Sequence, residues 1–233
     1  MSRIEPTIHE LWVADGLSNH PSQAMPAVSY ITLHTTGNRN PTATAESHAR
    51  FQFNGGGGRQ ASWHYTVDMD EIWQSFRDDQ VCWHTGTVRG NTNSIGIEIC
   101  VNSHEGFKAA CEKSAWLTAM LMEKHKLGFD GIVQHKDWSG KNCPRELISG
   151  EWGVSWEDFI AMVQGYYYGE EFRSQSQGQA NPCPAAMPST WAKTAWEWGT
   201  AYGITDGSNP RGSCTREQVV QLLFNYNARV INR

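Results

Sequence analysis

The chain has 233 residues, of which 39% are hydrophobic and 18% charged, so it can form a packed core and lacks the composition of a disordered protein. Its formal net charge is −5 and it has no long run of lysine or arginine, which argues against a nucleic-acid partner. The N-terminal residues resemble no signal peptide and nowhere do 18 apolar residues run together, so we expect cytoplasmic synthesis and no membrane insertion.

An α/β domain is predicted from the first part of the chain. Short β-type runs at residues 28–34, 62–68, 71–76, 94–101 and 132–135 alternate with helical patterns at 44–53 and 107–126. Residues 54–58, an asparagine followed by four glycines, and the Gly-, Thr- and Asn-rich residues 86–93 predict surface loops near a cleft. These patterns indicate a central β-sheet flanked by helices.

A domain boundary is predicted near residue 166. Residues 1–165 form the first domain, and residues 166–187, which are rich in Ser, Gln and Pro, are typical of a linker. In residues 188–233, an apolar stripe begins at Trp191 and a capping box at Thr215–Gln218 starts a second helix, which predicts a helical hairpin. So short a hairpin is expected to dock on another surface or to self-associate.

The residues best suited to bind a metal lie around a polar turn. His135 and Cys143 are eight positions apart, and zinc binds both imidazole nitrogen and thiolate sulfur. A catalytic zinc site needs a third protein ligand, and His34, at the end of an apolar strand, is the best candidate. Each of the three taken alone is more often an ordinary hydrogen-bonded surface residue than a metal ligand.

Four motifs, in this order, resemble the type 2 N-acetylmuramoyl-L-alanine amidases, a family that includes phage endolysins and peptidoglycan-recognition proteins. They are residues 31–38 (ITLHTTGN), 61–68 (ASWHYTVD), 93–100 (NSIGIEIC) and 135–144 (HKDWSGKNCP), within a resemblance that covers residues 26–164. The resemblance implies a mixed central sheet flanked by helices. It also implies a peptidoglycan hydrolase that cleaves the amide bond between N-acetylmuramic acid and L-alanine.

The resemblance assigns roles to particular residues. It implies that His34, His135 and Cys143 hold Zn²⁺, and non-catalytic relatives tend to lack the cysteine. Period-two alternation places Glu98 on the strand face opposite the isoleucines, and the resemblance makes it the general base toward a zinc-activated water. Lys141 matches a family lysine that stabilises the oxyanion of the tetrahedral intermediate.

Other aromatic residues are expected around the cleft. His84 resembles a residue of a family loop at the cleft rim, where an imidazole can contact the substrate. Trp63 stands where some relatives have a catalytic tyrosine; tryptophan cannot exchange a proton there, so a substrate-binding role is expected. Tyr65 and His64 are predicted to be core residues. Four further histidines, at positions 20, 48, 104 and 125, lack motif context and are expected on the surface.

The C-terminal segment resembles a single S-layer-homology repeat, through residues 191–198, 203–207 and 214–219. Such repeats bind cell-wall polymers and usually occur in threes. The resemblance therefore implies a module that binds a secondary cell-wall polymer, docks on the amidase domain or forms a homo-oligomer. A plain packing or dimerisation hairpin is the alternative.

The leading hypothesis is an endolysin that is made without a signal peptide in the host cytoplasm and acts on the bacterial cell wall after release. One alternative is a cytosolic amidase that recycles muropeptides. Another is a peptidoglycan-binding protein without catalytic activity, and a third is a structural adaptor built around the C-terminal hairpin. Zinc content and hydrolysis separate the enzymes from the other two classes.

Overall fold

A computed structural model of the chain describes residues 6–168, residues 193–201 and Leu222. The chain divides into two units, Met1–Ser176 and Gln177–Arg233. In the second unit the structure describes helix α8 (Lys193–Ala201), which lies in the predicted first helix of the hairpin. The rest of the hairpin, and the predicted linker beyond Tyr168, lie outside the described residues. Within the described ranges, no helix is both long and apolar enough to cross a membrane.

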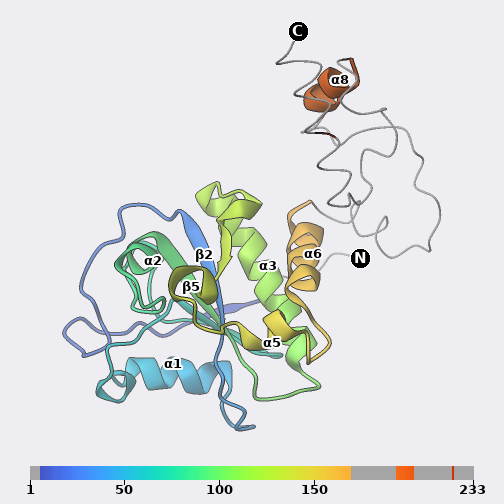
Figure 1. Cartoon of the computed structure of the whole chain (residues 1–233). Helices are drawn as coiled ribbons and strands as arrows, with labels where there is room; N and C mark the ends of the chain where they lie inside the picture. The colour runs from blue at the N-terminus through green and yellow to red at the C-terminus, as the bar shows by residue number, and fades with distance from the viewer. Residues whose placement is uncertain (1–5, 169–192, 202–221, 223–233) are drawn as a thin grey trace. The chain divides into compact units, whose positions relative to one another are not determined.

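The first unit is built on a six-stranded sheet with the order β1-β4-β3-β5-β2-β6 (Figure 1). All neighbouring strands run parallel except β3 and β4, which are antiparallel, so the sheet is mixed as predicted. The short edge strand β1 falls outside the predicted strands. The strands are β1 (Ile8–Glu10), β2 (Tyr30–Thr35), β3 (Tyr65–Val67), β4 (Ile72–Gln74), β5 (Ser94–Ile99) and β6 (Ile132–Gln134).

Both predicted helices of this domain are confirmed. Helix α1 (Ala45–Phe53) begins where the Thr44 hydroxyl accepts a hydrogen bond from the Ser47 amide, and α3 (Phe107–His125) ends at Lys126 in a left-handed conformation. Sequence patterns did not predict the remaining helices. These are α2 (Val88–Asn93), α4 (His135–Ser139), α5 (Arg145–Ser149), α6 (Trp156–Tyr167) and the 3₁₀ turns η1 (Gly56–Gly58) and η2 (Phe129–Gly131).

The prediction of a loop at 86–93 is wrong for residues 88–93, which form α2. Residues of this segment have low helix propensity, but the Thr87 hydroxyl caps the helix by accepting a hydrogen bond from the Gly90 amide. The Asn91 side chain accepts hydrogen bonds from the amides of His84 and Thr85, which ties the helix to the preceding loop. Side-chain hydrogen bonds therefore stabilise a helix that composition does not favour.

The two central strands separate the core from a polar face. Ile31 and Leu33 of β2, with Ile95 and Ile97 of β5, are fully buried in the hydrophobic core that also contains residues of α3 and α6. Because side chains alternate along a strand, Thr32, His34, Gly96 and Glu98 lie on the opposite face. His34 of β2 is the direct register partner of Glu98 on β5. This polar face carries the candidate site.

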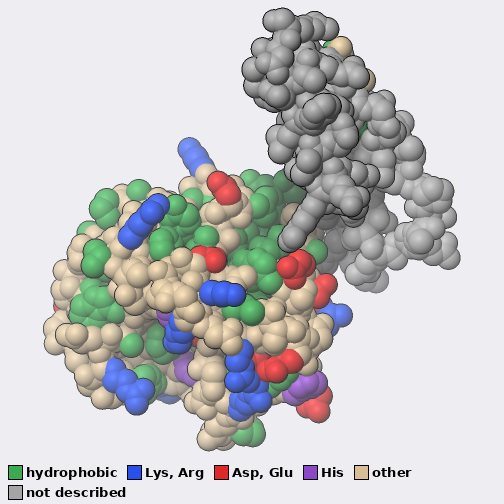
Figure 2. Space-filling view, in the orientation of Figure 1, with side chains coloured by type: hydrophobic (Ala, Val, Ile, Leu, Met, Phe, Trp, Pro, Cys, Tyr) green, Lys and Arg blue, Asp and Glu red, His purple; other side chains and the backbone are tan. Residues whose placement is uncertain are grey.

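The surface of the first unit that Figure 2 shows carries acidic and basic side chains scattered among hydrophobic and other residues.

Candidate metal centre and active-site pocket

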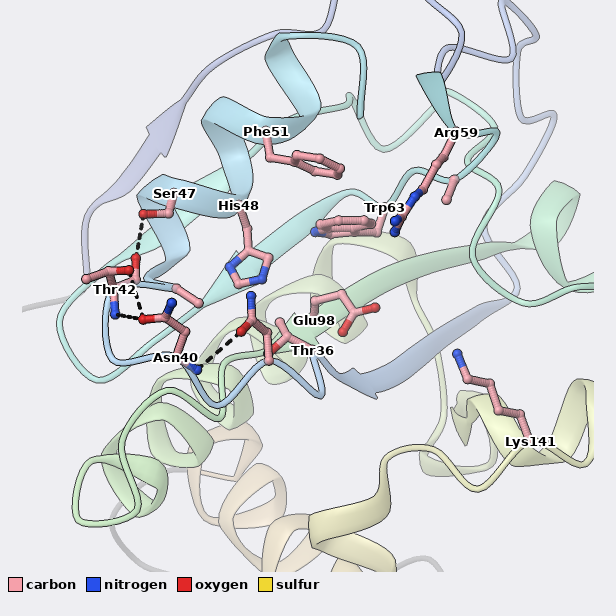
Figure 3. A pocket seen from close by; sticks show the side chains of 13 residues that line it. Thr36, Asn40, Thr42, Ser47, His48, Phe51, Arg59, Trp63, Glu98 and Lys141 are labelled. Atoms are coloured by element: carbon pink, nitrogen blue, oxygen red, sulfur yellow. Dashed lines mark hydrogen bonds between the residues drawn. The ribbon is translucent and has the colours of Figure 1, made fainter. Parts of the chain in front are cut away.

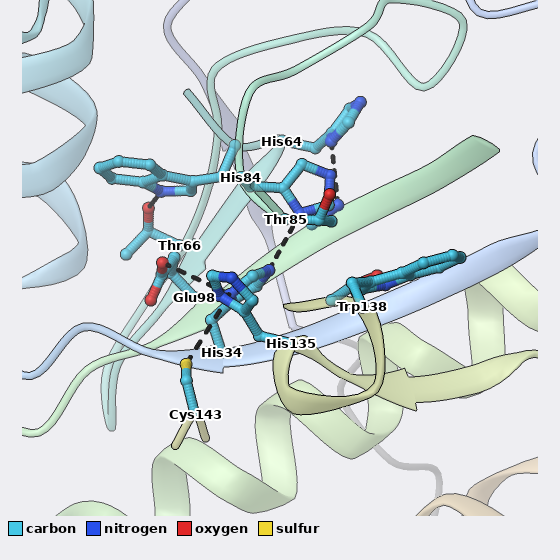
Figure 4. A network of polar contacts seen from close by, with 12 residues as sticks. His34, His64, Thr66, His84, Thr85, Glu98, His135, Trp138 and Cys143 are labelled. Carbon is cyan, nitrogen blue, oxygen red and sulfur yellow. Dashed lines mark hydrogen bonds and ion pairs between the residues drawn. The ribbon is translucent and has the colours of Figure 1, made fainter. Parts of the chain in front are cut away.

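Three side chains from separate parts of the chain converge on one point. His34 lies near the end of β2, and His135 begins α4 directly after β6, the strand that pairs with β2. Cys143 follows in the next loop, where its carbonyl accepts a hydrogen bond from the Lys136 amide at 2.9 Å. Parallel pairing of β2 and β6 therefore brings together two histidines that are far apart in sequence (Figure 4).

The geometry of these donor atoms fits a metal ion. Nδ1 of His34 is 3.0 Å from Nδ1 of His135 and 3.8 Å from Sγ of Cys143, and one ligand atom of each residue lies within 4.8 Å of the others. All three residues are buried. Two imidazole nitrogens and one sulfur form a donor set that zinc binds, with a fourth position left for water or substrate.

Burial disfavours charge on each of these groups. It lowers the pKa of His34 well below its usual value, with neighbouring His84, His135 and Lys141 adding to the shift. Burial, reinforced by Lys141, lowers the pKa of His135 to about 4. Burial and the nearby Glu98 raise the pKa of the Cys143 thiol to about 12. The histidines are thus neutral near pH 7, as metal ligands must be, and a bound cation would favour the thiolate.

Glu98 lies beside these three candidate metal ligands. One carboxylate oxygen, Oε1, is 4.0 Å from Nδ1 of His34, and the other, Oε2, is buried without a hydrogen-bond partner among the described residues. Burial raises the pKa of this carboxyl group to about 8, against the opposing effect of the Lys141 charge. A buried carboxylate oxygen that lacks a partner is suited to bind a water or a substrate group.

Glu98 and Lys141 also line a pocket of about 710 Å³. Figure 3 shows the Lys141 side chain reaching toward Glu98 from the other side of the pocket. The pocket extends from these residues to α1 and to the loop that follows β2. It is lined by Thr36, Asn38, Asn40, Thr42, Ala43, Ser47, His48, Phe51, Arg59, Ala61, Trp63, Glu98 and Lys141.

Trp63 lines this pocket, where a substrate-binding residue was expected. Its backbone amide donates to the side-chain oxygen of Gln52, and its indole N–H donates to the Thr66 hydroxyl at 2.7 Å. Because the indole N–H already has a partner, the ring offers its aromatic surface to the pocket. Sugar and peptide groups pack well against such surfaces.

His48 is placed differently from the prediction, which put it on the surface without a role. It lies on α1 and lines the pocket, and its Nδ1 is 2.8 Å from the carbonyl of Thr44. The carbonyl can only accept, so Nδ1 carries the hydrogen and Nε2 is left as an acceptor. Sequence spacing gave no sign of this, because His48 belongs to no motif and faces the pocket only through the orientation of α1.

His84 does not lie at the rim of the pocket. It is 9% exposed, is not among the pocket-lining residues, and its Nδ1 is 2.9 Å from Nε2 of His34. Burial, with a contribution from His64, lowers its pKa to about 3. Because His84 does not line the pocket, this position does not support the expected contact between His84 and the substrate. His84 instead contacts the side of His34 that faces away from His135 and Cys143 (Figure 4).

His64 and Tyr65 are core residues, as predicted. His64 is fully buried, and its Nε2 donates to the Gln80 carbonyl at 2.8 Å. Tyr65 is 2% exposed and donates its hydroxyl hydrogen to Asp78 at 2.6 Å. Neither side chain is among the three candidate metal ligands, and neither lines the pocket.

Comparison with known proteins gives a consistent match for this domain. The sequence model of a family described as N-acetylmuramoyl-L-alanine amidase matches residues 23–146, more than half of the chain. The chain is 40% identical over 152 residues to the N-acetylmuramoyl-L-alanine amidase XlyA of Bacillus subtilis, covering 64% of this chain and 48% of the relative. It is 38% identical over 157 residues to the amidase CwlH of the same species, covering 66% and 60%.

Solved structures agree with the fold. A mutant endolysin from Bacillus subtilis superposes with a TM-score of 0.62 at 38% identity, covering 68% of this chain and 99% of that one. The catalytic domain of XlyA superposes with a TM-score of 0.61 at 39% identity, covering 67% and 99%. The chain thus spans about half to three fifths of the length of these two full-length relatives but nearly all of the two solved chains.

Proposed function

Because the chain belongs to the N-acetylmuramoyl-L-alanine amidase family, we propose that it hydrolyses the amide bond between N-acetylmuramic acid and L-alanine in peptidoglycan, with zinc held by His34, His135 and Cys143. One observation carries the proposal. The ligand atoms of His34, His135 and Cys143 converge next to the pocket, and Glu98, which lines the pocket, has a buried carboxylate oxygen without a hydrogen-bond partner among the described residues.

Each residue of the junction has a task in amide hydrolysis. Zinc, when bound, would act as a Lewis acid toward the scissile carbonyl and would lower the pKa of a coordinated water. Glu98 is positioned to take a proton from the attacking water and to pass it to the alanine nitrogen as the carbon–nitrogen bond breaks. Lys141 supplies a positive charge close to the oxyanion that forms on the carbonyl oxygen.

The pocket supports a substrate larger than the scissile bond. Trp63 and Phe51 provide aromatic surface, while Asn38 and Asn40 provide amide groups that can hydrogen-bond to a peptide or a sugar. A pocket of about 710 Å³ lies in the size range of sites that enclose a small ligand. These features are those expected of a groove for a muramyl-peptide.

The test is a product analysis on purified peptidoglycan. We expect new N-terminal alanine amino groups without new reducing sugars, loss of this release after chelation, and recovery when zinc is returned. A Cys143→Ala variant should bind less zinc and release little alanine. New reducing sugars would indicate a glycosidase instead. If the zinc-loaded protein binds several types of cell wall and hydrolyses none of them, the protein is a peptidoglycan-binding protein without catalytic activity.

A further inference from the structure

A chain of hydrogen bonds, buried beyond its first member at Trp138, leads from α4 across the sheet toward His34. The Trp138 indole N–H donates to the Thr32 hydroxyl at 2.9 Å, and that hydroxyl donates to the Ser94 hydroxyl at 2.9 Å. The Ser94 hydroxyl in turn donates to the Gly90 carbonyl at 2.7 Å. Its single hydrogen is therefore already used, so the Ser94 hydroxyl can only accept from any further neighbour.

His84 meets this chain at Ser94. Its Nε2 is 3.2 Å from the Ser94 carbonyl oxygen and 3.5 Å from the Ser94 hydroxyl, and both of these oxygens act as acceptors. Nε2 of His84 must therefore carry the hydrogen. In a neutral imidazole the other nitrogen then has a free lone pair, so Nδ1 of His84 is an acceptor.

The acceptor of His84 determines the tautomer of His34. Nδ1 of His84 is 2.9 Å from Nε2 of His34, and this pair makes a hydrogen bond only if His34 carries its hydrogen on Nε2. Nδ1 of His34, the atom that faces His135 and Cys143, is then left with a free lone pair. That is the state in which an imidazole binds a metal ion.

We propose that His84 is a positioning residue for the metal centre: it accepts a hydrogen bond from Nε2 of His34 and so holds Nδ1 of His34 ready to bind zinc. The inference rests on the metal site of the proposed function and assigns His84 no contact with substrate. Ser94 completes the arrangement by accepting the hydrogen of His84.

A nuclear magnetic resonance experiment on the metal-free full chain tests the tautomer directly. In long-range ¹H–¹⁵N spectra of ¹⁵N-histidine-labelled protein, His34 should show an unprotonated Nδ1 and a protonated Nε2 at pH 7. Its signals are identified by their absence from a His34→Gln variant. A protonated Nδ1 on His34 in the wild-type protein would overturn the proposal, whatever the variants do.

Zinc affinity, measured by competition with a chelating dye, provides the second readout. His84→Phe keeps a planar ring but removes the acceptor, and loss of such an outer partner typically weakens metal binding by about 10- to 100-fold. His84→Asn, whose side-chain oxygen can replace Nδ1 as the acceptor, should recover most of the affinity and the tautomer. Unchanged zinc affinity and an unchanged His34 tautomer in His84→Phe would refute the role.

A matched control separates this role from general damage to the core. His64 is a second buried histidine next to His84, with ring centroids 5.9 Å apart, but it bonds to Gln80 and Gly96 and not to His34. His64→Phe should therefore leave the His34 tautomer unchanged. If the wild-type protein binds no zinc, the proposed function fails while the spectra still decide the tautomer. If it binds zinc and cuts peptidoglycan with Nδ1 of His34 protonated in the metal-free form, this inference alone fails.

Discussion

A single added methyl group at Gly96 should disturb the candidate metal centre through His84. A Cβ atom built at this position would lie 2.8 Å from Nδ1 of His84 and 2.9 Å from its Cγ. Nonbonded carbon atoms normally approach to about 3.5–4.0 Å, so the ring must move by roughly 0.5–1 Å in Gly96→Ala. The backbone at Gly96 is not in the left-handed region that disfavours alanine, and the three atoms nearest to the added Cβ all belong to the His84 ring.

The size of the effect follows from the bond that this movement breaks. The 2.9 Å contact between His84 and His34 would lengthen to about 3.5 Å or more, beyond a useful hydrogen bond. Loss of an outer-shell partner weakens metal binding by about 10- to 100-fold. This corresponds to roughly 1.4–2.8 kcal/mol in the free energy of zinc binding. The assay is zinc competition at pH 7 on the metal-free protein, with folding checked by circular dichroism.

Two control variants of the chain test whether the effect of Gly96→Ala acts through His84. Ile97→Val lies on the same strand but on the core face, and should cost about 0.5–1.5 kcal/mol of folding stability without changing zinc affinity. In a His84→Ala background the ring is absent, so Gly96→Ala should have little additional effect. Wild-type zinc affinity in Gly96→Ala, or an equal loss in the His84→Ala background, would contradict the reasoning.

Three other predictions concern catalysis, stability and the C-terminal unit. Glu98→Gln should still bind zinc but lose about 10²- to 10⁴-fold in the rate of alanine release, and near-normal turnover would remove Glu98 from the mechanism. Burial alone would raise the pKa of Asp78, but hydrogen bonds from Lys124, Tyr65 and His125 outweigh it and hold that pKa below its usual value. Asp78 therefore stabilises the fold fully above its unfolded pKa of about 3.9, and this contribution disappears as the pH falls through the lower folded pKa. Because Lys124 is largely exposed, the bonds from Tyr65 and His125 contribute most of this stabilisation. Asp78→Asn should therefore lower the free energy of unfolding by about 2 kcal/mol at pH 7, which corresponds to a fall of roughly 4–8 °C in the thermal midpoint. Thermal unfolding of the metal-free proteins should show this gap narrowing below pH 4, and a gap independent of pH would assign the loss to packing. Deletion of residues 188–233 should reduce the fraction that sediments with cell walls, or the oligomeric mass, while hydrolysis of small muropeptides persists; unchanged values for both would indicate a passive segment.

The sequence was sufficient to predict the central elements of the fold, because hydrophobic periodicity is strong there. Strands β2 and β5 and helix α3 have apolar residues at the spacing of their own secondary structure, and all three form the core. Short elements were predicted unevenly. The three-residue strands β3, β4 and β6 lie within predicted strands, whereas β1, of the same length, was missed. Helix α2 depends on hydrogen bonds that the side chains of Thr87 and Asn91 accept, which composition does not reveal.

The candidate ligands and the pocket residues Glu98, Lys141 and Trp63 could be proposed from motifs, but the positions of His84 and His48 could not. The spacing of His135 and Cys143 indicates a metal loop, whereas the position of His84 depends on how the loop before α2 folds back over β5. No local pattern encodes that contact, since His84 and His34 are 50 residues apart in sequence. The same limit applies to His48, which reaches the pocket only because α1 packs beside the polar face.

Strand β5 contributes several residues to the candidate site because its side chains alternate between two faces of the sheet. With a period of two, Ser94, Gly96 and Glu98 share one face, and each meets a different requirement there. Ser94 accepts the hydrogen of His84, Gly96 leaves room for the His84 ring, and Glu98 places a carboxylate 4.0 Å from His34. The alternate residues Ile95, Ile97 and Ile99 hold the strand against the core. Shifting the strand by one residue would exchange these two sets, so the hydrophobic register of β5 also fixes the geometry of the candidate site.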